Sequence, residues 1–242
     1  MSNDYAKDDI AKITDEIRSA SADAETVVLR SELAHFTADI FNTVGKELQT
    51  VGHIFGTDHK NGLSPNGHGS DEIVAVGLLL RIASQLISAA NDLFSDGRHY
   101  AAASLLRQLV EIEYLAWAFE TRDGDAERWL RSNSNERQSF FTPAKLRAAA
   151  QGKFRSKDYG YHCELGGHPV PGAIVLLRDD QAITQLLLSD MLGHSGRIWD
   201  HLLDWSHGNP WAVPLSKRKV EMYHRFANWK AADALTSVSP PP

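Results

Sequence analysis

The sequence predicts an all-α fold, a single multi-helix bundle of about seven to nine helices. Four long segments carry apolar residues at helical spacing, over about 24–55, 70–94, 172–205 and 216–235. A fifth segment, from about Arg98 to Phe119, is apolar on all of its sides, which is typical of a helix at the centre of a bundle. No segment shows the alternation of apolar and polar residues that marks a β-strand.

The chain is expected to divide into three parts. Isoleucines at helical spacing predict a short charged helix at about 8–19, and residues 1–22 are expected to form an N-terminal helix or arm. The all-helical domain is expected to span residues 23–235. The tail at 236–242 ends in three prolines and is expected to be disordered.

Turn signals separate the predicted helices. Gly, Asn and Pro crowd residues 56–69, so a loop is expected there. The tight break at 95–98 predicts that the helices on either side of it are antiparallel. Thr142 and Pro143 suit the N-cap and the first position of a further helix. Residues 159–171 contain paired glycines and a His-Pro dipeptide, which predict another loop.

Composition and charge are those of an ordinary soluble domain. The formal net charge of -6 provides no overall basic surface for nucleic acid. Cys163 is the only cysteine, which excludes an internal disulfide and a four-cysteine zinc site and fits a reducing cytoplasm. The N-terminus lacks a secretory pattern, and the apolar run Ile73–Leu80 is too short to cross a bilayer. We therefore expect a cytoplasmic protein without a membrane partner.

Two charged residues lie inside the apolar central helix. Arg107 and Glu111 are four residues apart, so they share a face and can pair within the helix. Buried charges are costly without a partner, so both side chains are predicted to be buried and paired with each other. Glu113 is expected to point elsewhere, because it lies on another side of the helix.

A polar stripe runs along the predicted helix at 172–205. Its members recur at intervals of three and four residues and therefore share one side: Asp190, His194, Arg197 and His201. In one interpretation the stripe is the solvated face of an amphipathic helix. In the other it faces Arg107 and Glu111 across a pocket, where acids and histidines can transfer protons or hold a metal.

The loop at 159–171 is expected to approach this pocket. Gly166 and Gly167 let the backbone come close to another element, and His168 is then expected to hydrogen-bond Glu111. The alternative is a His168 that is satisfied by packing alone. The predicted buried polar pocket has five members: Arg107, Glu111, His168, His194 and His201. No metal and no other cofactor is assigned. The histidines of the stretch at 53–68 are not spaced as the ligands of a known zinc-binding motif are.

Two motifs carry a resemblance to a known family. The segment Leu105–Glu111 has the form Arg-x-x-x-Glu within an apolar helix, and Tyr159–Pro169 ends in a His-Pro dipeptide. Together they resemble segments of uncharacterised bacterial all-helical proteins that are similar to the HEPN superfamily. The resemblance covers about residues 70–207. It implies a helical bundle with a role in bacterial defence, toxin–antitoxin or mobile-element systems.

The same resemblance implies an alternative activity. Ribonuclease members of the superfamily carry an arginine and a histidine separated by a short spacer, and this pair is thought to act on RNA at a dimer interface. Three arginine–histidine pairs of the chain have this spacing: Arg30 with His35, Arg155 with His162, and Arg218 with His224. Arg155 and His162 are the preferred candidates, because they lie in a locally basic stretch beside the glycine-containing loop. The resemblance thus implies a metal-independent ribonuclease with Arg155 and His162 as catalytic residues.

Three functional interpretations stay open. The first is a cytoplasmic helical protein that acts by binding a protein partner or a second copy of itself. The second is the HEPN-like ribonuclease, for which RNA would be the partner. The third is a metal-assisted hydrolase whose site is built from four residues: Glu111, His168, His194 and His201.

Overall fold

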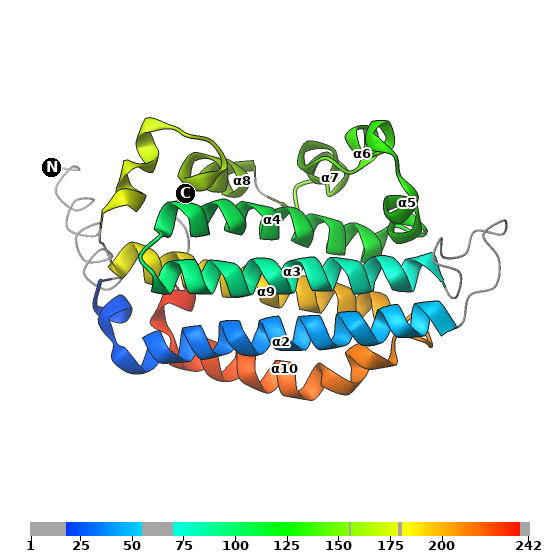
Figure 1. Ribbon diagram of the computed structural model, residues 1–242, viewed down its shortest axis with the longest axis horizontal. Helices are drawn as coiled ribbons and strands as arrows, with labels where there is room; N and C mark the ends of the chain where they lie inside the picture. Colours follow the sequence, from blue (N-terminus) through cyan, green and yellow to red (C-terminus); the bar gives the residue numbers. More distant parts are fainter. Residues whose placement is uncertain (1–17, 55–69, 155, 179–180, 238–242) are drawn as a thin grey trace, which may run out of the picture.

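Within the described residues the protein is built of helices alone (Figure 1). The computed structural model describes residues 18–54, 70–154, 156–178 and 181–237. Nine α-helices lie wholly within these residues, together with short 3-10 and π-helical turns, and the same residues contain no β-strand. The predicted all-α class and the expected number of helices are both confirmed.

Five long helices form the body of the protein: α2 (Ala24–Ile54), α3 (Asp71–Ser95), α4 (His99–Thr121), α9 (Gln181–Ser206) and α10 (Val213–Ala232). Of the first three, each runs antiparallel to the one before it, as predicted for α3 and α4 (Figure 1). Gly97 makes the tight turn between α3 and α4 with a φ of 72°, which glycine adopts without strain. α9 runs parallel to α4, and α10 returns along α2 and α9 (Figure 1).

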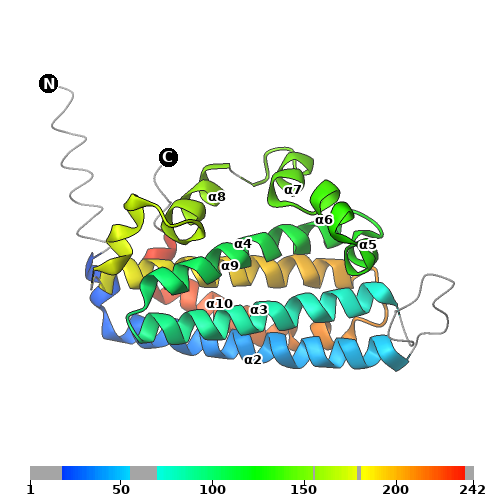
Figure 2. The same ribbon diagram turned by 45° about the horizontal axis from the view of Figure 1, so that its top comes forward.

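The long connection from α4 to α9 folds into short elements over one side of α4 (Figure 2). They are α5 (Asp125–Arg131), α6 (Ser134–Phe140), α7 (Pro143–Ala149), α8 (Ser156–His162), η2 (Cys163–Gly167) and η3 (Pro171–Leu177). Of these short helices, α6 was not predicted from the sequence. Its start is a capping box, in which the Asn133 side chain accepts from the Glu136 amide and the Glu136 carboxylate accepts from the Asn133 amide.

The apolar residues on all sides of α4 are explained by two separate hydrophobic cores, which cover different sides of the helix. Toward the bundle, Leu109 is fully buried in the main core. On a second side, Tyr114 and Trp117 pack against Phe141 and Leu146 in a smaller core beneath the connection. Full burial of one such side chain stabilises the fold by about 1.5–3 kcal/mol. The pattern of this helix therefore correctly predicted a central position.

The loop expected at 159–171 is instead partly helical. α8 extends to His162, and the chain continues as the π-helical turn η2. Glycine has a low helix propensity, but tertiary packing outweighs it here. The backbone of Gly166 lies so close to α4 that a Cβ atom would be 2.5 Å from the amide nitrogen of Ser104. The Ser104 hydroxyl also donates to the Gly166 carbonyl oxygen at 2.7 Å.

The helix expected over about 172–205 is divided into two elements. Its first part is the 3-10 helix η3, which ends where Arg178 takes up extended backbone, and α9 begins only at Gln181. The last helix begins at Val213, slightly earlier than expected, and the short turn η4 (Ala234–Ser237) follows it. The remainder of the predicted tail, 238–242, lies outside the described residues.

The described part of the predicted N-terminal arm, residues 18–22, is helical and contacts the bundle. The Ser21 hydroxyl donates to the Ala182 carbonyl oxygen of α9 at 3.4 Å. The Ala20 carbonyl oxygen accepts a hydrogen bond from Arg30 of α2 at 3.1 Å. The arm is therefore joined to α2 and α9 at this point.

A buried ion pair fastens the end of α10 to α2 and α9. Arg30 donates from Nε and Nη2 to the two carboxylate oxygens of Asp233, both at 2.7 Å, and both side chains are fully buried. Nη1 of Arg30 donates to Gln185 of α9 at 2.9 Å. Asp233 also accepts from the Trp229 indole and from the Leu235 amide. A desolvated pair of this kind depends on every one of these bonds.

By length and apolar composition, α3 could cross a membrane. Arg81 follows the apolar run Ile73–Leu80 and is the only basic residue of α3, and its guanidinium donates to Gln49 of α2 at 2.5 Å. Most of the apolar part of α3 is buried against other helices, which is consistent with the core helix of a soluble protein.

Candidate metal centre

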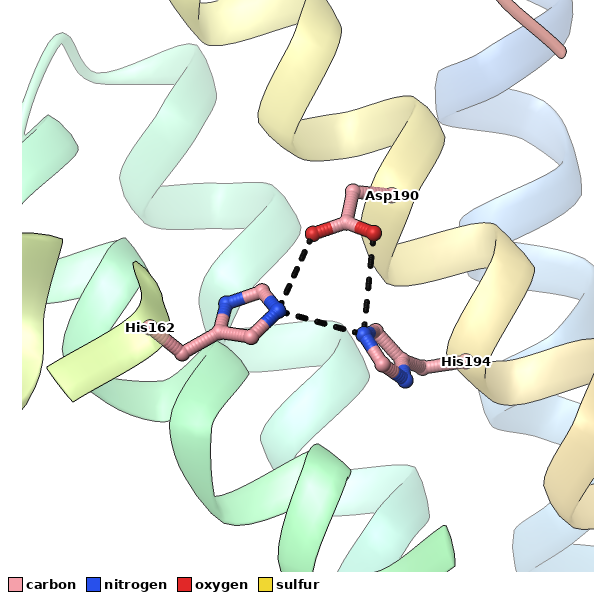
Figure 3. Close-up of side chains that lie close together, drawn as sticks. All are labelled: His162, Asp190 and His194. Atoms are coloured by element: carbon pink, nitrogen blue, oxygen red, sulfur yellow. Dashed lines mark hydrogen bonds and ion pairs between the residues drawn. The ribbon is translucent and has the colours of Figure 1, made fainter. Parts of the chain in front are cut away.

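Three side chains that can ligate a metal meet between α8 and α9 (Figure 3). The Nε2 atom of His162 lies 3.3 Å from a carboxylate oxygen of Asp190 and 3.3 Å from Nε2 of His194. The second Asp190 oxygen lies 3.6 Å from Nε2 of His194. Two imidazole nitrogens and a carboxylate thus point toward one common position.

The secondary structure brings these groups together. Asp190 and His194 are four residues apart on α9, so they project from one face of that helix, one turn apart. His162 is the last residue of α8, and the π-helical turn after it is fastened to α4 through Gly166. The close approach at Gly166 therefore fixes where the His162 side chain lies relative to α9.

Burial keeps the His162 side chain of this three-residue group uncharged at neutral pH. The side chains of His162 and His194 are only 4% and 7% exposed, whereas that of Asp190 is 35% exposed. Burial lowers the pKa of His162 to about 4, against the opposing effect of Asp190. His162 is therefore a neutral imidazole at pH 7, which is the form that binds metal ions. The site meets solvent on the side of Asp190.

A buried carboxylate lies behind His194. Nδ1 of His194 is 2.6 Å from Oε2 of Glu113, whose side chain is 5% exposed, and Nε of Arg197 donates to Oε1 of Glu113 at 2.8 Å. Burial raises the pKa of Glu113, but the hydrogen bond from His194 and the charges of His194 and Arg197 outweigh it and lower this pKa to about 2. Glu113 is therefore an ionised acceptor.

The distances fit a metal ion better than a hydrogen-bonded cluster. Ligand atoms held at about 2.0–2.1 Å from a tetrahedral zinc ion lie about 3.3–3.4 Å from one another. The separations of 3.3, 3.3 and 3.6 Å among His162, Asp190 and His194 are close to this value. Direct hydrogen bonds between such groups would be shorter, about 2.7–3.0 Å. The three side chains are therefore close enough together to hold one metal ion.

The polar stripe of α9 faces α4, so its interpretation as a solvated face is wrong for the two histidines. His194 and His201 are both buried, whereas Arg197 is half exposed. Their partners are Glu113 and Glu120, not Arg107 and Glu111. Glu113 and Glu120 are seven residues apart on α4, and so are His194 and His201 on α9, so the two pairs lie one heptad apart along parallel helices.

Arg107 and Glu111 are paired as predicted, but they are not fully buried. Their ion pair is 3.3 Å long, and the side chains are 28% and 31% exposed. The Tyr159 hydroxyl, rather than His168, donates to Glu111 at 2.9 Å, and burial together with Glu111 raises the pKa of Tyr159. His168 is exposed, because the chain before it is helical and places Tyr159 over α4. The predicted pocket that joined all five residues is wrong.

The predicted ribonuclease pair and the His-rich stretch both include residues outside the described part of the chain. Arg155 lies outside the described residues, so its distance from His162 has no structural description. His162 itself is buried against α9, where it contacts Asp190 and His194. Of the His-rich stretch at 53–68, residues 55–68 also lie outside the described residues.

The chain matches no family model, no curated protein and no solved structure. The resemblance to the HEPN superfamily stays a prediction. The geometry around His162, Asp190 and His194 is therefore the observation from which a function can be argued.

Proposed function

We propose that this protein is a metalloprotein in which His162, Asp190 and His194 bind one divalent transition-metal ion, and that the bound ion activates water for hydrolysis. The single observation behind this proposal is the convergence of three ligating side chains: Nε2 of His162 and Nε2 of His194 lie 3.3 Å apart, and each lies 3.3 to 3.6 Å from one of the two Asp190 carboxylate oxygens. A tetrahedral ion requires donor separations of this size.

The donor set favours zinc over the hard cations. Magnesium and calcium prefer oxygen ligands, whereas two imidazole nitrogens and one carboxylate oxygen suit zinc and its neighbours in the first transition row. A set of two histidines and one carboxylate is also used by non-haem iron enzymes, so iron(II) is the alternative ion. Within the described residues, no other group of three histidine, cysteine or acidic side chains meets in this way.

The number of ligands supports a catalytic role. Structural zinc sites are closed by four protein ligands, whereas catalytic sites use three and keep the fourth position for water or substrate. Asp190 is the exposed edge of the group, so the fourth position would be reached from solvent on its side. A zinc ion lowers the pKa of its bound water to about 7, which supplies hydroxide at neutral pH.

The proposed ligands differ from those of the metal-assisted hydrolase that was predicted from the sequence. The proposal also departs from the expectation that the protein binds no metal. Of the earlier set, only His194 takes part, while His162 and Asp190 provide the other ligands. Cytoplasmic localisation, a bacterial defence context, a protein partner or homodimer, and RNA as a substrate stay predictions, because no observation on this chain addresses them.

A zinc titration tests the proposal. Protein prepared without a histidine tag and stripped with a chelator is expected to bind one equivalent of Zn²⁺ and to hydrolyse bis(4-nitrophenyl) phosphate or 4-nitrophenyl acetate in proportion to zinc occupancy. His207→Ala is the matched control, because His207 is 63% exposed beside Asp204 and outside the group. Absence of a one-to-one complex would refute the metal site, and a zinc complex without hydrolysis would refute the catalytic role.

A further inference from the structure

One ring nitrogen of His194 has two neighbours that make opposite demands on it. Nδ1 lies 2.6 Å from a Glu113 oxygen and 2.7 Å from Nη2 of Arg197. A carboxylate can only accept, and a guanidinium can only donate. Nδ1 therefore either carries a proton and donates to Glu113, or carries a lone pair and accepts from Arg197, and it cannot do both at once.

The choice at Nδ1 decides what His194 presents to the metal position. In a neutral imidazole, a proton on Nδ1 leaves the lone pair on Nε2, which faces His162 and Asp190. A proton on Nε2 would instead point a hydrogen atom at the same position and block ligation. Arg197 also donates from Nε to Glu113, which holds the carboxylate in place against the imidazole.

We infer that Glu113 sets the tautomer of His194, so that the lone pair on Nε2 already faces the metal position before any ion is bound. Glu113 is then a positioning residue, and Arg197 orients it. The inference deepens the proposed function, on which its consequence for metal affinity rests, but the tautomer is a property of the metal-free protein. Carboxylates that hold ligating histidines in this way are a general feature of metal sites.

Glu113→Gln is an informative variant because it retains the shape and reverses the hydrogen-bonding demand. With Arg197 donating to its oxygen, the amide group of the new side chain turns its NH₂ toward Nδ1 of His194. Nδ1 must then accept, and the proton moves to Nε2. Glu113→Asp keeps the carboxylate and is expected to retain the wild-type tautomer.

The chain also provides a matched control. Glu120 pairs with Nδ1 of His201 across the same two helices, one heptad further along. Neither residue belongs to the group of three metal-ligating side chains. Glu120→Gln therefore perturbs an equivalent pair without altering the metal position.

Two measurements test the inference. Nitrogen-15 NMR of the metal-free protein, with His194→Gln to assign the signals, is expected to find the proton of His194 on Nδ1 in the wild type and on Nε2 in Glu113→Gln. A wild-type proton on Nε2 would overturn the inference, whether or not the protein binds zinc. Zinc affinity is expected to fall about 10–100-fold in Glu113→Gln, to recover in part in Glu113→Asp and to stay within about twofold of wild type in Glu120→Gln.

The possible failures are distinguishable. If the wild type binds no zinc, the proposed function fails while the NMR result still decides the tautomer. If the wild type binds zinc and Glu113→Gln binds it equally well, the positioning role fails while the metal site stands. Should Glu113→Gln not fold, as judged by circular dichroism, the wild-type and Glu113→Asp spectra still decide the inference.

Discussion

Replacing Asp233 by asparagine is expected to lower the free energy of unfolding by about 3–5 kcal/mol, because it leaves the Arg30 guanidinium buried without a counter-charge. Arg30 and Asp233 share two hydrogen bonds of 2.7 Å, and neither side chain is exposed to solvent. Urea unfolding at pH 7 measures the change. A loss below about 1 kcal/mol would show that the charge is solvated or compensated in another way.

Two controls separate burial from charge. Glu221→Gln breaks an exposed pair with Arg218 of similar type, 3.3 Å long, and is expected to cost no more than about 1 kcal/mol. The double variant Arg30→Met with Asp233→Leu removes both charges and is expected to recover much of the stability, because packed apolar side chains can replace a buried ion pair. If the double variant is as unstable as Asp233→Asn, the loss does not come from the unpaired charge.

The pair also predicts how stability depends on pH. Burial raises the pKa of Asp233, but the hydrogen bonds from Arg30 and from the Leu235 amide outweigh it, and the pKa lies below the ordinary value of 3.8. A carboxyl whose pKa is lower in the folded state stabilises the fold above its unfolded pKa, and this contribution disappears as the pH falls through the folded value. Wild type is therefore expected to lose more stability below pH 4 than Asp233→Asn does.

Replacing His194 by alanine is expected to weaken zinc binding by at least about 100-fold, because it removes a ligand, and loss of an outer partner alone already costs 10–100-fold. His162→Ala is expected to behave in the same way. Competition against a chromophoric chelator at pH 7 measures both affinities. Wild type at zinc concentrations about 100 times its dissociation constant should also gain about 2.7 kcal/mol of stability, which these variants should lack.

His201→Ala is the closest control for this prediction. His201 is also a buried histidine of α9 that pairs with a glutamate of α4, but it does not belong to the group of ligands. Its replacement should lower stability while leaving zinc affinity unchanged. Equal affinities for His194→Ala and His201→Ala would mean that His194 does not ligate the ion.

Most of the fold could be predicted because it depends on local patterns. The helix at about 98–119 is apolar on all sides, and α4 is covered on both faces. Predictions failed where distant contacts outweigh local signals. The glycines at 166 and 167 indicated a loop, but Gly166 is a helical residue pressed against α4. Such an approach involves residues 62 positions apart in the chain, which no local pattern reveals.

The site was predicted only in part, for a similar reason. His194 is buried against α4, as one interpretation of the stripe predicted, but its partner there is Glu113 rather than Arg107 or Glu111. Glu113 was set aside because it does not share a face with Arg107, although the face it occupies is the one that meets α9. The seven-residue interval from Glu113 to Glu120, matched by His194 and His201, was a usable signal. His162 had no such signal, because its position depends on how α8 packs.

X-ray absorption spectroscopy of the zinc-loaded protein tests the central claim most directly. The three-ligand site predicts two imidazole nitrogens and two oxygens, one from Asp190 and one from water, at about 2.0–2.2 Å from the ion. The imidazole scattering should diminish when either His162 or His194 is replaced. A sulfur ligand at about 2.3 Å, which Cys163 as the single cysteine of the chain would have to provide, or a shell without imidazole would contradict the account.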